Sequence, residues 1–223
     1  MLELQGIART LELQGIARTL ELQGIACVRG GRSLFSGVDL TLQPGQLLRV
    51  TGVNGAGKTS LLRLLCGLLT PERGQVRWGG QNIAGLRDEF NRQLVYIGHA
   101  AALKDDLSAL ENLQAACVLG GSVSTDSDAL GALGRAGLRG RERVPVRRLS
   151  QGQRRRVSLA RLTLAAAAPL WVLDEPFNAL DTAATAWLLA LITEQLQRGG
   201  MVVLTSHQSV ALSDAVHQVT LSL

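Results

Sequence analysis

The chain has 223 residues, of which 46% are hydrophobic and 18% are charged, with a formal net charge of +5. This length fits one α/β domain that carries a small subdomain. The longest apolar run, Leu162 to Leu173, contains Pro169 and is shorter than the roughly 20 residues that cross a bilayer. Because no cationic and apolar leader begins the chain, we expect it to remain in the cytoplasm.

The positive charge comes almost entirely from arginine, and many arginines fall between Arg135 and Arg161. Nucleic acid would suit a basic segment, but this one has no aromatic residue on which a base could stack. Solvated helix faces explain the charge better, and an anionic membrane surface nearby would also suit it. We therefore expect no nucleic-acid partner. The cysteines, Cys27, Cys66 and Cys117, are far apart and predict buried thiols rather than disulfides or a metal site.

The first 26 residues are a repeat with a period of nine. LELQGIART occupies residues 2–10 and 11–19, and LELQGIA returns at 20–26. Nine residues are too few for the usual helical solenoid units, so a tandem duplication with two spare copies is the simpler interpretation. We expect the folded domain to span residues 20–223 and residues 1–19 to lie outside its core.

Strands and helices alternate after the repeat. Alternating apolar and polar residues predict the first two strands, and an apolar run after the turn at Pro44-Gly45 predicts a buried third. The three predicted strands are Leu20–Ala26, Val38–Leu42 and Leu47–Thr51. A helix is expected over Lys58–Leu69, since Pro71 follows it.

A helical region follows from about Leu107 to Ala167, within a subdomain of about residues 100–165 that is inserted into the α/β core. Capping boxes are expected at Ser108–Glu111 and Ser150–Gln153. The remaining predicted strands are Leu170–Leu173, Met201–Thr205 and a final short pair within Val216–Leu221.

A glycine-rich loop lies between the third strand and the first helix. Its residues are Gly52, Val53, Asn54, Gly55, Ala56, Gly57, Lys58 and Thr59, with Ser60 next. In this strand–loop–helix context, backbone N–H groups would hold the phosphates of ATP, with Lys58 at the β- and γ-phosphates and the Thr59 hydroxyl on Mg²⁺. A dinucleotide-binding loop is excluded because Lys58-Thr59 stand where its third glycine would be.

Polar residues follow two of the later strands. Asp174 ends the strand Leu170–Leu173 and would hold Mg²⁺ through water, and Glu175 would be the catalytic base that accepts a proton from the attacking water. His207 lies just beyond Met201–Thr205, at the edge of the sheet where parallel α/β folds bind ligands. We expect it to contact the γ-phosphate and to orient that water.

A second phosphate-binding segment lies far along the chain, at Leu149-Ser150-Gln151-Gly152-Gln153. Ser150 would cap the next helix and leave N–H donors free, while Gly152 would allow close backbone approach. One ATP cannot easily use both segments of a single chain. We therefore expect a head-to-tail homodimer, in which each ATP lies between one chain's phosphate loop and its partner's Ser150 helix.

These motifs together resemble the nucleotide-binding subunit of ABC transporters. They are GVNGAGKT, LSQGQRRRVSLAR, LWVLDEP, Asn178-Ala179-Leu180-Asp181 and Thr205-Ser206-His207, in the family's order. The resemblance implies a P-loop NTPase with a RecA-like core, hydrolysis of ATP with Mg²⁺, and separate integral membrane subunits. It also implies that Asp181 crosses the dimer interface and that the segment around His99 faces the membrane partner.

Within that family, the chain looks most like the ATP-binding subunit of haem exporters in bacterial cytochrome c maturation. This closer resemblance is carried by Tyr96-Ile97-Gly98-His99, by Asp174-Glu175-Pro176-Phe177 and by GGMVVLTSHQ at 199–208. It implies that ATP hydrolysis drives haem export, or release of a haem-carrying chaperone, at the cytoplasmic face of the bacterial inner membrane. The alternative is the ATP-binding subunit of another small exporter, which would share every catalytic motif.

Some residues depart from the general ABC pattern. Gln151 replaces a glycine, His99 replaces the glutamine that usually touches Mg²⁺ and the attacking water, and Arg29 replaces the aromatic residue that stacks on adenine. An imidazole can still donate or accept a hydrogen bond, and a planar guanidinium can stack on a base. We expect these changes to affect the rate of hydrolysis and the choice of base rather than ATP binding.

Two other classes of NTPase fit the sequence less well. A soluble ABC-type ATPase that acts on DNA or the ribosome would carry a second cassette or a long coiled coil, and this helical insertion shows no sustained heptads. The other class is a GTPase or a small-molecule kinase: the base-reading motif NKxD of GTPases is absent from the sequence, and the helix that follows Ser150 would be unexpected in this class. The transported substrate is not encoded here, because specificity belongs to the membrane partner.

Overall fold

The computed structural model describes residues 18–121, 123–206 and 217–223. The strands are β1 (Leu20–Arg29), β2 (Arg32–Leu42), β3 (Gln46–Thr51), β4 (Arg73–Trp78), β5 (Gln81–Asn82), β6 (Leu94–Ile97), β7 (Leu170–Leu173), β8 (Met201–Thr205) and β9 (His217–Ser222). The helices are α2 (Lys58–Leu65), α3 (Arg87–Asn91), α4 (Ala109–Leu119), α5 (Asp126–Arg135), α6 (Gln151–Leu164) and α7 (Thr182–Gln197), with 3₁₀ turns η1 (Ile83–Gly85) and η2 (Val146–Arg148).

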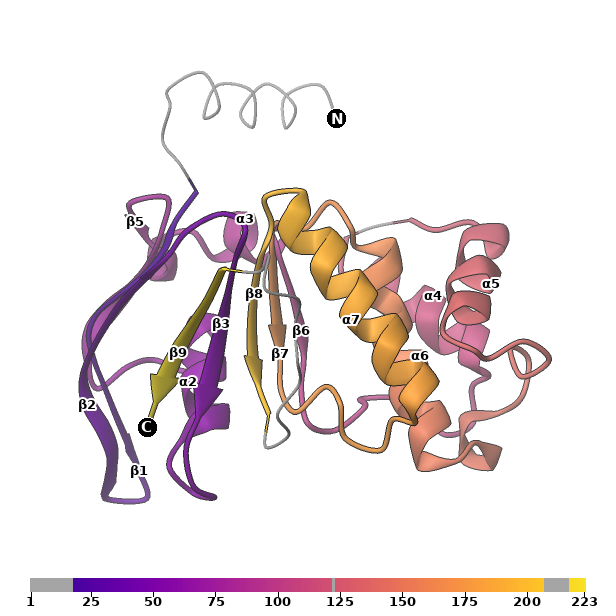
Figure 1. Cartoon of the computed structure of the whole chain (residues 1–223), viewed down its shortest axis with the longest axis horizontal. Coiled ribbons are helices and arrows are strands. Elements are labelled where there is room, and N and C mark those ends of the chain that lie inside the picture. Colours follow the sequence, from indigo (N-terminus) through magenta and orange to yellow (C-terminus); the bar gives the residue numbers. More distant parts are fainter. Residues whose placement is uncertain (1–17, 122, 207–216) are drawn as a thin grey trace.

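The central sheet is parallel and has the strand order β6-β7-β8-β3-β9. Every residue of β7 and β8 is buried, as expected for strands in a sheet that is covered on both faces. One face of the sheet packs against α2, and the other packs against α6 and α7. The predicted central parallel strands are therefore confirmed, and their carboxyl ends all lie at the lower edge in Figure 1.

A second, antiparallel sheet has the order β2-β1-β4-β5. Its apolar side chains share one cluster with those of α2 and with one face of the central sheet, so α2 lies between the two sheets. The predicted strands β1 and β2 form, and both extend further toward the turn that joins them. The sequence interpretation had assigned no element to the stretch that forms β4, β5, α3 and β6.

Helices α4, α5 and α6 surround an apolar cluster of their own, at the right-hand end of the molecule in Figure 1. Helix α6 also packs against the central sheet, so it joins this helical unit to the strands. Both predicted capping boxes form, since the hydroxyls of Ser108 and Ser150 accept hydrogen bonds from the backbone three residues on. A third capping box, at Thr125–Asp128, begins α5.

The first helix is shorter than predicted. The sequence predicts a helix over Lys58–Leu69, but α2 ends at Leu65. The backbone at Gly67 has a φ of +68°, and the N–H of Leu68 donates to the Arg63 carbonyl. This hydrogen bond and the left-handed glycine are the usual way in which a helix closes its C-terminus, so glycine rather than proline ends this one.

The end of the chain also differs from the prediction of a strand pair. Among the described residues at the C-terminus, a single strand, β9, pairs in parallel with β3 from Gln46–His217 to Thr51–Ser222. The next residue extends this pairing, because the N–H of Leu223 donates to the Thr51 carbonyl. Strand β8 pairs with one edge of β3, so a single further strand, β9, completes the pairing of β3.

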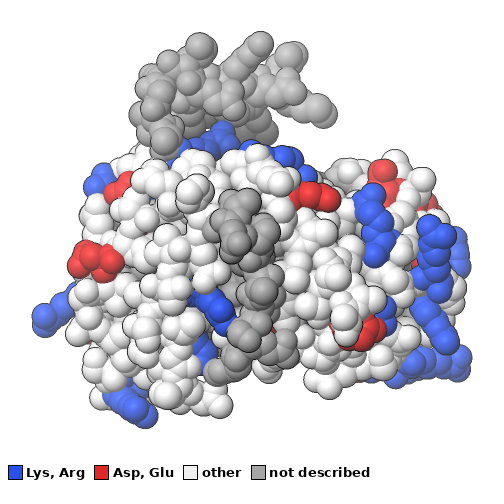
Figure 2. Space-filling model, in the orientation of Figure 1, with Lys and Arg blue, Asp and Glu red and all other residues white. Residues whose placement is uncertain are grey.

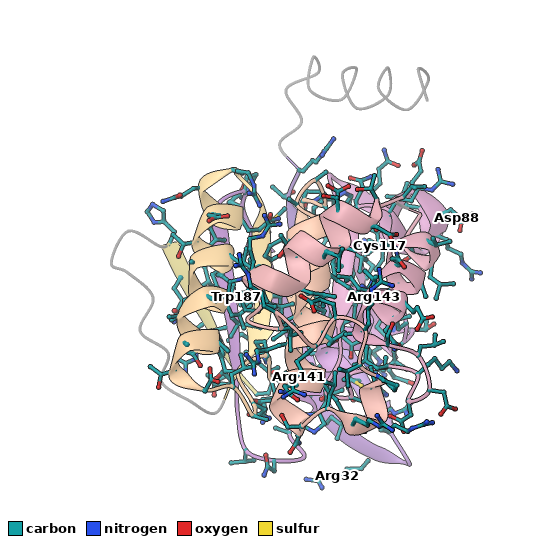
Figure 3. All side chains as sticks on the ribbon, turned by 90° about the vertical axis from the view of Figure 1, so that its right-hand side faces the viewer. Arg32, Asp88, Cys117, Arg141, Arg143 and Trp187 are labelled. Atoms are coloured by element: carbon teal, nitrogen blue, oxygen red, sulfur yellow. The ribbon has the colours of Figure 1, made fainter. Side chains whose placement is uncertain are left out.

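Basic side chains gather over the helical unit in the right-hand part of Figure 2. The exposed arginines of this region are Arg135, Arg139, Arg141, Arg143, Arg147 and Arg148. Arg141 and Arg143 lie on the connection between α5 and α6 (Figure 3). The three cysteines are buried and form no disulfide, as predicted. Within the described ranges, no helix is both long and apolar enough to cross a membrane.

Candidate nucleotide site

A pocket of about 490 Å³ opens at the carboxyl ends of the central strands. Its described lining residues are Leu34, Asn54, Gly55, Gly57, Lys58, Thr59, Ser60, His99, Asp174, Glu175 and Asn178. They come from the phosphate loop, from the ends of β6 and β7, and from β2. The fold thus brings together the loop, the two carboxylates and His99, as the sequence predicts. Leu34 and Asn178 were not among the predicted site residues.

The phosphate loop wraps around the side chain of Lys58. The ammonium Nζ donates to the carbonyls of Gly52, at 2.8 Å, and Val53, at 3.2 Å. Gly57 has a φ of +104°, and a Cβ there would lie 2.9 Å from the ring of Phe35. The loop therefore needs glycine to turn directly into α2, whose N-terminus carries the partial positive charge that favours phosphate.

Asp174 connects the phosphate loop to β8. The Thr59 hydroxyl donates to one carboxylate oxygen at 2.9 Å, and the Thr205 hydroxyl donates to the other at 2.8 Å. Thr205 in turn accepts a hydrogen bond of 2.8 Å from the N–H of Glu175. Asp174 is buried, and these hydrogen bonds give each of its carboxylate oxygens a partner and fix the direction of the side chain. From the sequence, Thr205 is predicted as the end of a strand and as part of a family motif, without a contact of its own, and the structure shows that it supports both carboxylate residues.

The oxygen atoms of Thr59 and Asp174 are the kind of ligand that Mg²⁺ prefers, and they lie together at the pocket. Among the described residues, no cluster of three or more His, Cys, Asp or Glu side chains could hold a metal ion alone. A magnesium ion that shares its remaining coordination with nucleotide phosphates and water fits this donor set. When bound, such an ion neutralises charge on the β- and γ-phosphates.

Glu175 has an uncommon backbone conformation. Its φ is +48°, and Ala179, in the same turn after β7, has a φ of +61°. Left-handed residues other than glycine are uncommon and persist where the surroundings hold them in place. Here the side chain of Glu175 is buried at the pocket, one residue beyond Asp174. The turn therefore directs two successive carboxylates to one site.

The Ser150 segment lies outside the pocket of its own chain. Ser150 caps α6 with its hydroxyl on the N–H of Gln153 at 3.2 Å, and Gln153 caps it in return through its Oε1. Ser150 and Gln151 are exposed. None of the residues 150–153 is among the described residues that line the pocket, and Figure 1 shows α6 beginning well to the right of the β3–α2 connection.

Comparison with known proteins identifies the family. A family model for ABC transporters matches residues 35–178. The cytochrome c biogenesis ATP-binding export protein CcmA of Dechloromonas aromatica (strain RCB) is 54% identical over 184 residues, or 82% of this chain and 90% of that protein. The chain belongs to the CcmA family of ABC transporter ATP-binding proteins. It is accordingly an ATP-hydrolysing ABC ATPase, as the resemblance implied.

Other relatives and solved structures agree. The CcmA protein of Pseudomonas aeruginosa is 49% identical over 187 residues, which are 84% of this chain and 92% of that protein. A putative ABC transporter ATP-binding protein from Pyrococcus furiosus matches with a TM-score of 0.78 and 25% identity, over 92% of this chain and 97% of that one. The cassette MJ0796, in a dimeric post-hydrolysis state bound to ADP and Pi, matches with a TM-score of 0.72 and 24% identity, over 85% and 88%. The ABC-type P-loop NTPase fold is thereby confirmed.

Two other predicted site residues of this CcmA-family chain, Arg29 and Asp181, are not among the described residues that line the pocket. Arg29 is exposed at the end of β1, whereas Leu34 of the neighbouring strand lines the pocket. Asp181 is the N-cap of α7, where its carboxylate accepts a hydrogen bond of 2.8 Å from the N–H of Ala184. His207 falls outside the described residues. The roles assigned to these residues stay predictions.

Proposed function

We propose that this chain is the ATP-hydrolysing subunit of a membrane ABC complex, and that it couples ATP hydrolysis to haem export or haem-chaperone release in cytochrome c biogenesis. The observation that carries the proposal is the 54% identity to a protein named as a cytochrome c biogenesis export ATPase, over 82% of this chain. The integral membrane subunits would be separate chains, and the ATPase would lie at the cytoplasmic face of the bacterial inner membrane.

The pocket supports specific roles for its residues. Lys58 and the loop N–H groups would hold the β- and γ-phosphates, and Thr59 with Asp174 would hold Mg²⁺. Glu175 would take a proton from the attacking water, since it lines the pocket next to Asp174. His99 also lines the pocket, so its imidazole is available to the same water or to the phosphate. His207 would add a contact to the γ-phosphate.

A head-to-tail homodimer would complete each site. Ser150 and Gln151 are exposed and do not line their own chain's pocket, so the free donors at the start of α6 are available to a nucleotide held by a partner. Asp181 would lie near this interface, because it caps α7 directly after the turn that follows Glu175. In this arrangement each ATP is bound by both chains and holds them together.

A Glu175→Gln variant tests the dimer. Without the base, bound ATP should persist and hold two chains together, so size-exclusion chromatography in ATP and Mg²⁺ should show a dimer. Lys58→Ala is the matched control, since it should lose the phosphate contact and remain monomeric under the same conditions. A Glu175→Gln chain that binds ATP and stays monomeric would contradict the composite site.

The biological role has a separate test in the native host. The gene is deleted, and covalently attached haem is stained in membrane and periplasmic fractions after complementation with the wild type or with Glu175→Gln. If the proposal is right, c-type cytochromes disappear and only the wild type restores them. If they persist undiminished in the deletion strain, the chain serves another small exporter, and the haem assignment is wrong.

A further inference from the structure

Arg155 is a buried arginine on the helix that begins with the Ser150 segment. Only 5% of the residue is exposed, although it carries a guanidinium group. All three nitrogens of the guanidinium donate to backbone carbonyls just beyond β6 and β7. The acceptors are Gly98 at 2.8 Å, His99 at 3.5 Å, Asp174 at 2.7 Å, Glu175 at 2.9 Å and Pro176 at 3.4 Å.

This arrangement uses the full hydrogen-bonding capacity of arginine. A guanidinium has five N–H donors in a fixed plane, and here they meet five carbonyl oxygens. Burial lowers the pKa of Arg155, and the nearby carboxylates of Asp174 and Glu175 counteract that effect. Asp174, Glu175 and Pro176 are buried, so the loss of Arg155 would leave their carbonyls without this donor in a buried place, which is costly. The contacts are therefore a strong local constraint on the backbone of both strand ends.

The constraint falls on the residues that are proposed to carry out hydrolysis. Arg155 holds the carbonyls of three successive residues, Asp174 to Pro176, where the backbone takes the left-handed turn at Glu175. Arg155 also donates to the carbonyls of Gly98 and His99, two successive residues that follow β6. The direction of both side chains into the pocket depends on these two backbone segments.

We propose that Arg155 is a positioning residue for ATP hydrolysis, which fixes where the Glu175 carboxylate and the His99 imidazole lie in the pocket. The proposal rests on the proposed roles of those two residues. Arg155 itself touches neither the nucleotide pocket nor the phosphate loop among the described contacts. Its loss should therefore slow the chemical step without weakening ATP binding.

The position of Arg155 on α6 adds a link between the two sites of the dimer. Ser150 caps the start of this helix, and Arg155 follows after about 7 Å of helix axis. An ATP that is held by the partner chain would bind at the capped start of α6. The same helix carries Arg155, whose guanidinium donates to the Glu175 carbonyl of its own chain. Hydrolysis in one site would thus depend on correct engagement at the other end of α6.

Two variants of Arg155 and one control test the proposal in the complex purified from the native host. Lysine keeps the charge but has one nitrogen in place of the planar fork, and glutamine removes the charge. Arg156→Lys is the control, because Arg156 lies next in the helix, and its side-chain hydrogen bonds within the described part of the chain go to the carbonyls of Ala136 and Gly137 in the helical unit. Its turnover should stay within about twofold of the wild type, since those contacts are partly exposed.

The measurements are kcat, KM and the Kd of Mg-ATP, with thermal unfolding as a check of folding. For Arg155→Lys we expect kcat to fall at least about tenfold, a loss of roughly 1.4 kcal/mol in transition-state stabilisation, while the Kd of Mg-ATP changes less than about twofold. Arg155→Gln should lose more. Wild-type kcat in both folded variants, or an equal loss of ATP affinity and kcat, would overturn the proposal.

Single-turnover hydrolysis in the Glu175→Gln background separates positioning from a general structural effect. If Arg155 acts through Glu175, adding Arg155→Lys to Glu175→Gln should slow the residual rate by a much smaller factor than it slows the wild type. Equal factors in the two backgrounds would show that Arg155 acts independently, and would refute the proposal. A Glu175→Gln variant with wild-type turnover would instead refute the role proposed for Glu175, so the two failures are distinguishable.

Discussion

We expect the glycine at position 152, in the Ser150 segment, to be required for the stability of a single folded chain as well as for binding a nucleotide that two chains share. A Cβ at this position would lie 2.5 Å from the carbonyl oxygen of Ala179, closer than real Cβ contacts. Ala179 has a φ of +61° in the turn that follows Glu175. Because the obstacle is backbone in a constrained turn, it cannot rotate away as a flexible side chain would.

The expected cost of Gly152→Ala follows from this contact. Forcing an extra methyl group into a packed site costs typically about 1–3 kcal/mol. Alanine regains at most about 1 kcal/mol of helix propensity at position 152. Since the clash is with backbone, we expect a net loss of about 1–2 kcal/mol, or a Tm lower by roughly 2–8 °C for a chain of this size.

Thermal unfolding of the full chain without nucleotide measures this loss directly. Gly131→Ala, in the middle of α5, is the matched control, because a Cβ there meets nothing within 4 Å. This control should be stabilised by up to about 1 kcal/mol. If Gly152→Ala unfolds at the wild-type temperature without nucleotide but loses ATPase activity, the intrachain reasoning is wrong and the glycine serves only the shared site.

Three further predictions concern pH, thiol reactivity and the repeat. The hydrogen bond from the Ser108 hydroxyl is the main cause of a lowered pKa at Glu111. The stability that this hydrogen bond contributes is therefore present at pH values above the ordinary glutamate pKa of about 4.3, and it is lost as the pH falls through the lowered pKa. In urea unfolding, Ser108→Ala should therefore lower stability more at pH 7 than at pH 2.5, and equal losses would contradict the coupling. Burial raises the pKa of the Cys66 thiol, so iodoacetamide should label it only after denaturation, and mass spectrometry showing rapid native labelling would argue against that burial. Deletion of residues 2–19 should leave ATPase activity and complex assembly intact, whereas loss of either would show that the repeated copies are needed.

Much of the fold and part of the site could be predicted because the relevant physics is local. Helix caps depend on side chains three residues apart, so the capping boxes at Ser108 and Ser150 are predicted correctly. Buried parallel strands appear as continuous apolar runs, so β7 and β8 are predicted correctly as well. The short elements β4, β5, α3 and β6 are not predicted, since so few residues leave little periodicity, and α2 ends early because Gly67 closes it. Residues 1–17 of the repeat and His207 lie outside the described residues, so the predictions for them stand untested, whereas the third copy of the repeat lies in β1.

The sequence alone determined the chemistry that neighbouring residues create: a glycine-rich turn into a helix, a strand that ends in Asp174 and Glu175, and a capped helix at Ser150. Only the tertiary structure decided which distant groups meet. It placed Thr205 on Asp174, Gly152 against Ala179, and the Arg155 guanidinium among the carbonyls around Glu175. For the contacts of Gly152 and Arg155, the physical reason is that their partners are backbone carbonyls, which are the same in every residue. No side-chain pattern can therefore mark where an arginine or a glycine will meet them.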